Sequence, residues 1–240
     1  MYTALSTTTD LQKAPTRLAI LPIGATEQHS HHLPLATDSI VIETIGLGVA
    51  KALNAYCLPT LPFSASHMHR GCRGTVWLRN STLQMVVRDI AASVRHEGFT
   101  QLVLLNGHGG NFILMAAVQD LNMEFPDLLT MCVDPFERMA ESGIFPHLKG
   151  MSHGDEMETS SLLHLRPETV RLKLAVDPKV EPDREMLRYL PFKEFSKWTH
   201  SGVPTKSSAA QGRRAIEFMI SHCVKTIRNS IRKVGSRQKK

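Results

Sequence analysis

The stretch QLVLL, residues 101–105, is an apolar run that leads directly into the polar loop NGHGGN, residues 106–111. A short apolar run bounded by turn residues predicts a strand that is buried on both faces of a sheet. We expect a helix to follow the loop as far as about Glu124, and the next apolar run, LLTMCV at 128–133, to form another strand. This order of elements is typical of a βαβ unit in a parallel sheet.

The rest of the chain continues this alternation of strands and helices. The other predicted strands are RLAILPIG at 17–24 and AYCLPTL at 55–61, and the other predicted helices span 39–53, 82–96 and 156–165. Pro59 makes its strand a short or edge strand, and Asn80-Ser81 can cap the helix that follows. We therefore expect an α/β fold, a three-layer α/β/α sandwich with a central, mostly parallel sheet.

The length and composition fit one domain. The chain has 240 residues, of which 42% are hydrophobic and 21% charged, and no linker separates two halves. We expect a poorly ordered N-terminal extension at 1–16, a single domain at 17–228 and a basic C-terminal tail at 229–240. From Arg228 onward the chain has six basic residues and no acid, so most of its net charge of +6 lies there. Basic residues interleaved with aromatic ones are absent, which does not favour nucleic-acid binding.

Membrane and secretory signals are also absent from the sequence. No run of about 18 apolar residues occurs, and the polar N-terminus lacks the apolar region of a signal peptide. The four cysteines, Cys57, Cys72, Cys132 and Cys223, are scattered without paired spacing, which favours reduced thiols over disulfides or a zinc-finger site. We therefore expect a cytoplasmic protein without a membrane partner.

The segment EQHSHHLPLATD, residues 27–38, follows the first predicted strand and is rich in possible metal ligands. The alternation of Glu27 and His29 would place both side chains on one side of an extended segment. Together with Asp38, they offer carboxylate and imidazole donors that suit zinc, manganese or iron. An ordinary polar loop would explain Glu27-Gln28-His29 alone, but it explains three histidines in four positions poorly.

The loop at 106–111 follows the strand at 101–105, so His108 is expected near the carboxyl ends of the parallel strands, where ligands gather. Its glycines allow close approach of the backbone to a ligand, and a phosphate-binding loop is the competing interpretation. The spacing matches neither common phosphate-binding pattern and no lysine follows, so His108 favours a metal.

A third cluster, SHGDEMETS at 152–160, contains His153 and Glu158. Acidic residues in the first turn of a helix would explain this segment without any function. Together with the two upstream motifs, however, His153 and Glu158 become candidates for a metal-dependent site.

These three motifs, in this order, resemble those of the creatininase (creatinine amidohydrolase) family. The family pattern reads P-x-G-x-x-E-Q-H-G-x-H-L-P-L-x-T-D, then N-G-H-G-G-N, then H-x-G-x-x-E-T-S. The resemblance runs over 17–167 and more loosely to 228. It implies two divalent ions per chain, Zn, Mn or Fe. Glu27, Asp38 and His108 would hold one ion, and His29 with a bridging Asp38 would hold the second.

The chain departs from the family pattern at the second ion. The glutamate that completes this site in creatininase is replaced here by Gly110, and Glu158 is our candidate for its role, as a ligand or as a base. His153 matches the catalytic histidine of the family, which delivers a proton to the leaving nitrogen. The family turn G-F-P-G-T is Gly71-Cys72-Arg73-Gly74-Thr75 here, so Arg70 or Arg73 could meet an anionic group of the substrate, or belong to a basic surface loop.

The resemblance implies a metal-dependent amidohydrolase that cleaves a non-peptide C–N bond of a small cyclic amide or formamide. A metal-bound hydroxide would attack the carbonyl carbon. The departure at Gly110 argues against creatinine itself. The alternatives are a metallopeptidase that acts on a short peptide precursor and a non-catalytic, metal-binding member of the family. The resemblance also implies a homo-oligomer, in the family often a hexamer.

Overall fold

The computed structural model describes residues 1–148, 153–179, 185–197 and 199–237. Its helices are α1 (Thr8–Gln12), α2 (Thr37–Leu53), α3 (Asn80–His96), α4 (Ile113–Glu124), α5 (Glu156–Leu165), α6 (Phe192–Phe195) and α7 (Ala209–Arg237), with short 3₁₀ helices between them. Its strands are β1 (Leu18–Ile23), β2 (Tyr56–Cys57), β3 (Gln101–Asn106) and β4 (Leu129–Val133). The described part of the chain holds no helix that is long and apolar enough to cross a membrane.

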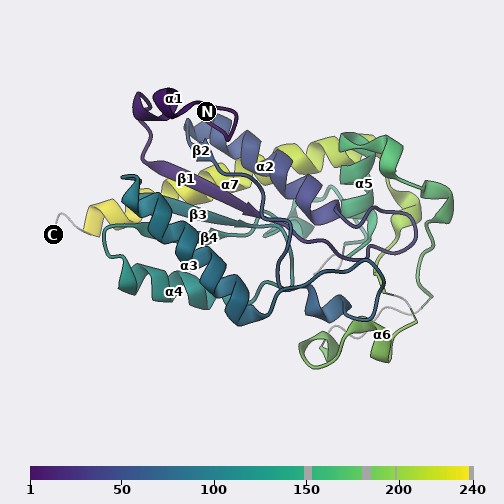
Figure 1. Cartoon of the computed structure of the whole chain (residues 1–240). Helices are drawn as coiled ribbons and strands as arrows, with labels where there is room; N and C mark the ends of the chain where they lie inside the picture. The colour runs from purple at the N-terminus through teal and green to yellow at the C-terminus, as the bar shows by residue number, and fades with distance from the viewer. Residues whose placement is uncertain (149–152, 180–184, 198, 238–240) are drawn as a thin grey trace.

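The strands form one parallel sheet in the order β2-β1-β3-β4. β1 pairs with β3 over its whole length, from Leu18 opposite Gln101 to Ile23 opposite Asn106. All six residues of β1 are buried, as expected of an inner strand covered on both faces. The predicted three-layer α/β/α sandwich is therefore confirmed, and Figure 1 shows the sheet between its two helical layers.

Alternate residues of the strands pack into two separate cores. Ile20 and Val103 face the layer of α2, α5 and α7, whereas Leu21 and Leu104 face the layer of α3 and α4. This alternation follows from the two-residue period of a strand. It explains why the apolar runs in the sequence are continuous, since both sides of each strand are covered.

Two predicted boundaries were wrong. The strand predicted at 55–61 has ladder pairing only at Tyr56 and Cys57, and beyond it only an isolated bridge joins Leu61 to β1; its edge position and short length agree with the prediction made from Pro59. The cap predicted at Asn80-Ser81 does not form, because α3 already begins at Asn80 with Arg79 as its N-cap residue.

No helix was predicted after residue 165, and the structure adds the long helix α7. Its buried residues Ala215, Met219, Cys223 and Ile227 recur every four positions on the face that packs on α2 and α5. Gly212 allows the close approach to α5, since a Cβ there would lie 1.9 Å from the Ser160 carbonyl oxygen.

Both terminal segments take part in regular structure. Near the N-terminus, Tyr2 forms a parallel bridge with Tyr56 of β2, and α1 follows. At the other end, α7 continues as far as Arg237, which includes most of the predicted basic tail; residues 238–240 lie outside the described residues. The division into an extension, a domain and a tail stays a prediction.

Candidate metal centre

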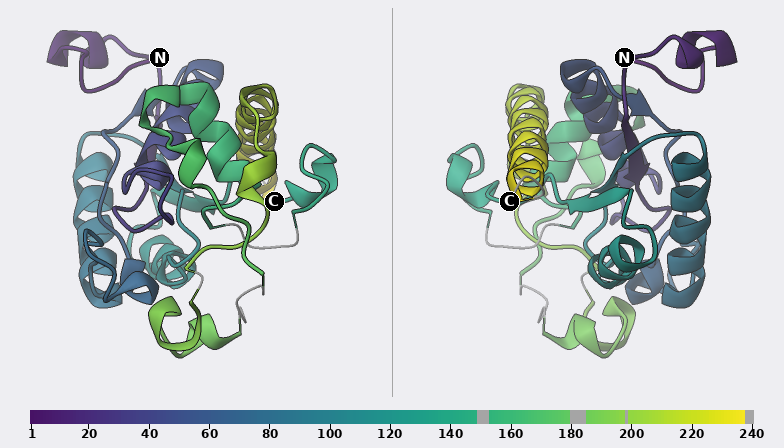
Figure 2. Two further views of the ribbon diagram at one scale, coloured as in Figure 1. Left: turned by 90° about the vertical axis from the view of Figure 1, so that its right-hand side faces the viewer. Right: turned by 90° about the vertical axis from the view of Figure 1, so that its left-hand side faces the viewer.

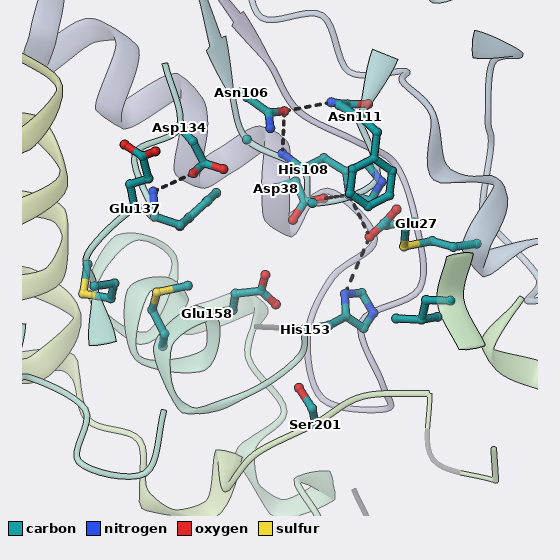
Figure 3. Close-up of a pocket in the computed structure, with 18 of the residues that line it drawn as sticks. Glu27, Asp38, Asn106, His108, Asn111, Asp134, Glu137, His153, Glu158 and Ser201 are labelled. Carbon is teal, nitrogen blue, oxygen red and sulfur yellow. Dashed lines mark hydrogen bonds and ion pairs between the residues drawn. The ribbon is translucent and has the colours of Figure 1, made fainter. Parts of the chain in front are cut away.

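The predicted site residues converge beyond the carboxyl ends of the strands, at one end of a cavity of about 640 Å³ (Figure 3). The segment from Glu27 follows β1, His108 follows β3, and Asp38 lies in the first turn of α2. Figure 2 shows α6 projecting from the body of the molecule, and its residue Phe192 also lines the cavity. The topology thus brings together three motifs that lie far apart in the sequence.

The segment after β1 turns two side chains into the centre. Glu27 and His29 are both fully buried, and the Nδ1 atom of His29 lies 3.1 Å from the backbone oxygen of Glu27. Ser30 has a φ of +61°, a left-handed conformation that glycine adopts more readily. This backbone conformation gives a physical reason for the glycine that the family pattern has at this position.

Asp38 lies between two histidines. Its Oδ1 atom is 3.1 Å from Nε2 of His29, and its Oδ2 atom is 3.2 Å from Nδ1 of His108. The same nitrogen of His108 lies 3.3 Å from Oε1 of Glu27. Asp38 thus directs one oxygen toward His29 and the other toward His108.

Two asparagines hold the loop at 106–111. Asn106 Oδ1 accepts hydrogen bonds from the backbone N–H of His108 and from the side chain of Asn111. A Cβ atom at Gly110 would lie 2.4 Å from Nε2 of His108 and 2.9 Å from the Ala65 carbonyl oxygen. With the loop in this conformation, no side chain fits at position 110, so this position offers no carboxylate to the centre.

Glu158 adds a third carboxylate to those of Glu27 and Asp38, and it lies next to His29. Asp155 caps α5 by accepting from the N–H groups of Met157 and Glu158, which fixes the first turn of the helix. Glu158 Oε2 accepts from the Gly154 N–H and lies 3.5 Å from Nε2 of His29. Ser152, the first residue of this motif, lies outside the described residues.

His153 and His69 complete the centre, and His69 is the residue that sequence reasoning missed. The two rings stack with centroids 4.1 Å apart, and each is within 3.6 Å of Oε1 of Glu27. His69 belongs to a 3₁₀ helix, Ser66–His69, which none of the three sequence motifs includes. Its only sequence signal is its position just before the turn at 71–75.

Other residues considered in the sequence lie apart from the centre. His31 is exposed, and the buried His32 contacts Thr159 through Nε2 at 2.8 Å. Arg70 is exposed and pairs with Glu194 at 3.4 Å. Neither Arg70 nor Arg73 is among the described residues that line the cavity, so the cavity gives no support to their binding an anionic substrate group.

Burial and charge set the protonation of the metal-free centre. Burial raises the pKa of Glu158 to about 8, lowers that of His69 to about 4 and lowers that of His153 well below its usual range. Burial would also lower the pKa of His29, but the carboxylates of Asp38 and Glu158 outweigh it and raise this pKa to about 10. In the metal-free centre, a proton is therefore held at His29, where the carboxylates of Asp38 and Glu158 converge.

The donor set fits a divalent cation. Both side-chain oxygens of Glu27 and Oδ2 of Asp38 are buried and, although histidine nitrogens lie close, have no partner in hydrogen-bond geometry. The ligand atoms of Glu27, His29 and Asp38 lie within 4.8 Å of one another, as do those of His29, His153 and Glu158. Buried carboxylates that lie this close together are costly unless a cation compensates their charge.

Known proteins match nearly the whole chain. The family model described as creatinine amidohydrolase matches residues 4–227. The mycofactocin precursor peptide peptidase of Mycobacterium ulcerans (strain Agy99) is 30% identical over 93% of this chain and 90% of its own length. The creatinine amidohydrolase of Pseudomonas putida is 26% identical, over 89% and 88%. The solved structure titled "Creatininase Mn" has a TM-score of 0.81 at 20% identity, covering 95% of this chain and 98% of that chain.

Proposed function

Because the chain belongs to the creatinine amidohydrolase (creatininase) family, whose members hydrolyse C–N bonds, we propose that it is a metal-dependent hydrolase that cleaves an amide bond in a short peptide. The observation that carries the metal dependence is the convergence of the buried carboxylates of Glu27, Asp38 and Glu158 on His29 and His108. This substrate was the alternative interpretation of the sequence.

Two divalent ions suit the donors of the centre. Glu27, Asp38 and His108 would hold one, and His29, Asp38 and Glu158 would hold the other. Bound divalent ions would supply an activated water nucleophile and positive charge for the carbonyl oxygen. Manganese and zinc suit mixed carboxylate and imidazole donors, and solved creatininases of a Mn and a Zn–Zn type share this fold.

His153 is suited to the transfer of a proton to the leaving nitrogen. Its ring lines the cavity, and its Nδ1 atom lies 3.6 Å from Oε1 of Glu27, beside the proposed first ion. Because burial lowers its pKa, the ring would first take up the proton released by the attacking water and then deliver it to the leaving amine, a task for which histidine is the commonest side chain.

The cavity supports a substrate larger than creatinine. Its volume of about 640 Å³ lies in the range of sites for drug-sized ligands, and beyond the carboxylates its walls are largely apolar. Phe112 and Met115 line it although more than half of each side chain remains exposed, so its rim is open to an extended chain. The relative at 30% identity is named a peptidase, which agrees with this choice.

A small cyclic amide is the second candidate, and the creatinine amidohydrolase at 26% identity favours it. A substrate screen separates the two. Protein stripped with chelator and reloaded with Mn²⁺ or Zn²⁺ is incubated with a peptide library, creatinine, lactams and formamides, and mass spectrometry detects the products. Peptide cleavage only by reloaded protein is the expected result. Cleavage of creatinine or a formamide alone would favour the second candidate, and no cleavage by metal-loaded protein would favour the non-catalytic alternative.

Glu158 is testable apart from turnover. Replacing it by glutamine should lower the number of bound divalent ions by about one per chain, because the amide is a poorer ligand than the carboxylate. Metal analysis after reconstitution measures this number. Glu156→Gln is the matched control, since Glu156 lies in the same turn of α5 but accepts from Gln211. An unchanged metal content in Glu158→Gln would remove Glu158 from the ligand set.

The family resemblance also suggests a homo-oligomer with a hexamer as the first candidate, which remains a proposal. Met123, on α4 and outside the cavity lining, leaves a large apolar side chain exposed that a second subunit could cover.

A further inference from the structure

Gln28 lies behind two of the histidines and contacts both. Its side chain is buried, and its Nε2 atom is 2.9 Å from Nδ1 of His69 and 2.9 Å from Nε2 of His153. It belongs to none of the proposed ligand sets, although it stands between two proposed ligands in the sequence. A buried amide that touches two active-site rings can decide which nitrogens of those rings carry protons.

The orientation of the Gln28 amide follows from its other partners. The Ser30 backbone N–H can only donate, and it lies 3.0 Å from Oε1 of Gln28. The Thr199 hydroxyl donates to the same oxygen at 2.9 Å. The atom that faces the histidines is therefore the NH₂ group. An NH₂ group has no acceptor lone pair, so both ring nitrogens that face it must accept.

The two hydrogens of this NH₂ group are shared among three acceptors, because the Thr199 backbone oxygen also lies 2.6 Å from Nε2 of Gln28. This sharing does not change the conclusion that the ring nitrogens of His69 and His153 that face the NH₂ group are unprotonated. His69 carries its proton on Nε2, which lies 3.2 Å from Oε1 of Glu27, and His153 carries its proton on Nδ1. A protonated ring nitrogen donates a hydrogen bond and cannot bind a metal ion.

His29 obeys the same rule with the opposite outcome. Its Nδ1 atom faces the backbone oxygen of Glu27, which can only accept, so Nδ1 carries the proton. Its Nε2 atom faces Asp38 and Glu158, whose carboxylates keep this nitrogen protonated in the metal-free protein; a bound cation would displace that proton and take the lone pair. The partner behind each ring thus determines whether the histidine offers a lone pair or a hydrogen to the centre.

We propose that Gln28 is a positioning residue that fixes His69 and His153 as hydrogen-bond donors and so keeps both rings out of the metal coordination. Without it, the ligand atoms of Glu27, His69 and His153, which lie within 4.8 Å of one another, would form a competing metal site. The proposal rests on the proposed function for the presence of metal, but the proton positions can be read in metal-free protein.

Nitrogen-15 NMR of histidine-labelled, metal-free wild-type protein at mildly alkaline pH tests this assignment without any variant that must fold. Loss of signals in His69→Gln and His153→Gln protein identifies the two rings. We expect unprotonated Nδ1 in His69 and unprotonated Nε2 in His153. A proton on either of these nitrogens would overturn the proposal, whether or not a substrate is ever found.

Gln28→Glu keeps the shape of the side chain but replaces the donating NH₂ group with a carboxylate oxygen, which can only accept. The protons should move to Nδ1 of His69 and Nε2 of His153, and metal affinity or kcat should change by about 10–100-fold, as for other groups that orient metal ligands. Gln28→Met keeps the volume without hydrogen bonds and should show mixed tautomers. If Gln28→Glu folds and keeps the wild-type tautomers, Gln28 does not set them.

Discussion

Replacement of Asp38 by asparagine is expected to abolish hydrolysis and to release both metal ions. Asp38 lies 3.1 Å from His29 and 3.2 Å from His108, so it is the one described carboxylate in contact with both halves of the centre. Asparagine keeps the shape but removes the charge that balances two cations. Loss of a single electrostatic contact to the transition state costs about 10²–10³-fold in kcat, and loss of both ions should exceed that.

Metal analysis and a peptide-cleavage assay measure this effect together. Asp134→Asn is the matched control, because Asp134 lines the same cavity outside the cluster of ligands. We expect the control to keep its metal. Asp38→Asn protein that retains about two ions per chain would show that Asp38 does not bridge them.

His153→Ala is expected to keep its metal and to lose turnover. Nε2 of His153 faces Gln28 and Nδ1 faces Glu27, so in the proposed arrangement the ring is a donor rather than a ligand. Removal of a general acid typically lowers kcat by about 10²–10⁴-fold. KM should change less, because the remaining cavity wall is retained.

Single-turnover kinetics and metal analysis of the same preparation separate these effects. His164→Ala, at an exposed histidine of α5, controls for the substitution itself. Full activity in His153→Ala would mean that another group protonates the leaving nitrogen. Loss of metal in this variant would instead make His153 a ligand and contradict the role proposed for Gln28.

The parallel sheet was predictable from the sequence because its signals are local. Each of the runs at 18–23, 101–106 and 129–133 is short and apolar and is followed by polar residues. Because the strands were predicted to be parallel, the polar residues that follow them were expected together at the carboxyl ends of the strands. The structure brings together all the candidates chosen from the three motifs: Glu27, His29, Asp38, His108, His153 and Glu158.

What the sequence could not show depends on contacts between distant segments. His69 enters the centre only because its 3₁₀ helix packs beside the loop at 106–111, where Asn111 accepts from the Ala65 N–H. Gln28 gains its role from Thr199, which is 171 positions away. Neither residue shows a periodicity or a spacing that marks it in a single sequence.

The position of Glu158 illustrates the same limit. The sequence indicated that a ligand was missing at Gly110, but only the structure shows that a Cβ there would collide with His108. It also shows that Glu158 approaches His29 from α5, in a helical layer, whereas Gly110 lies in the loop that follows β3 of the sheet. The proposed substitution of one carboxylate by another would be a property of the assembled site rather than of either motif.

The metal content of wild-type protein tests the central claim most directly. The protein is stripped with chelator, reloaded with Mn²⁺ or Zn²⁺, freed of loose ions and analysed by mass spectrometry of its metals. The carboxylates and histidines around Asp38 predict about two tightly bound divalent ions per chain. Fewer than one ion per chain after reloading would contradict the dinuclear centre and the hydrolytic function built on it.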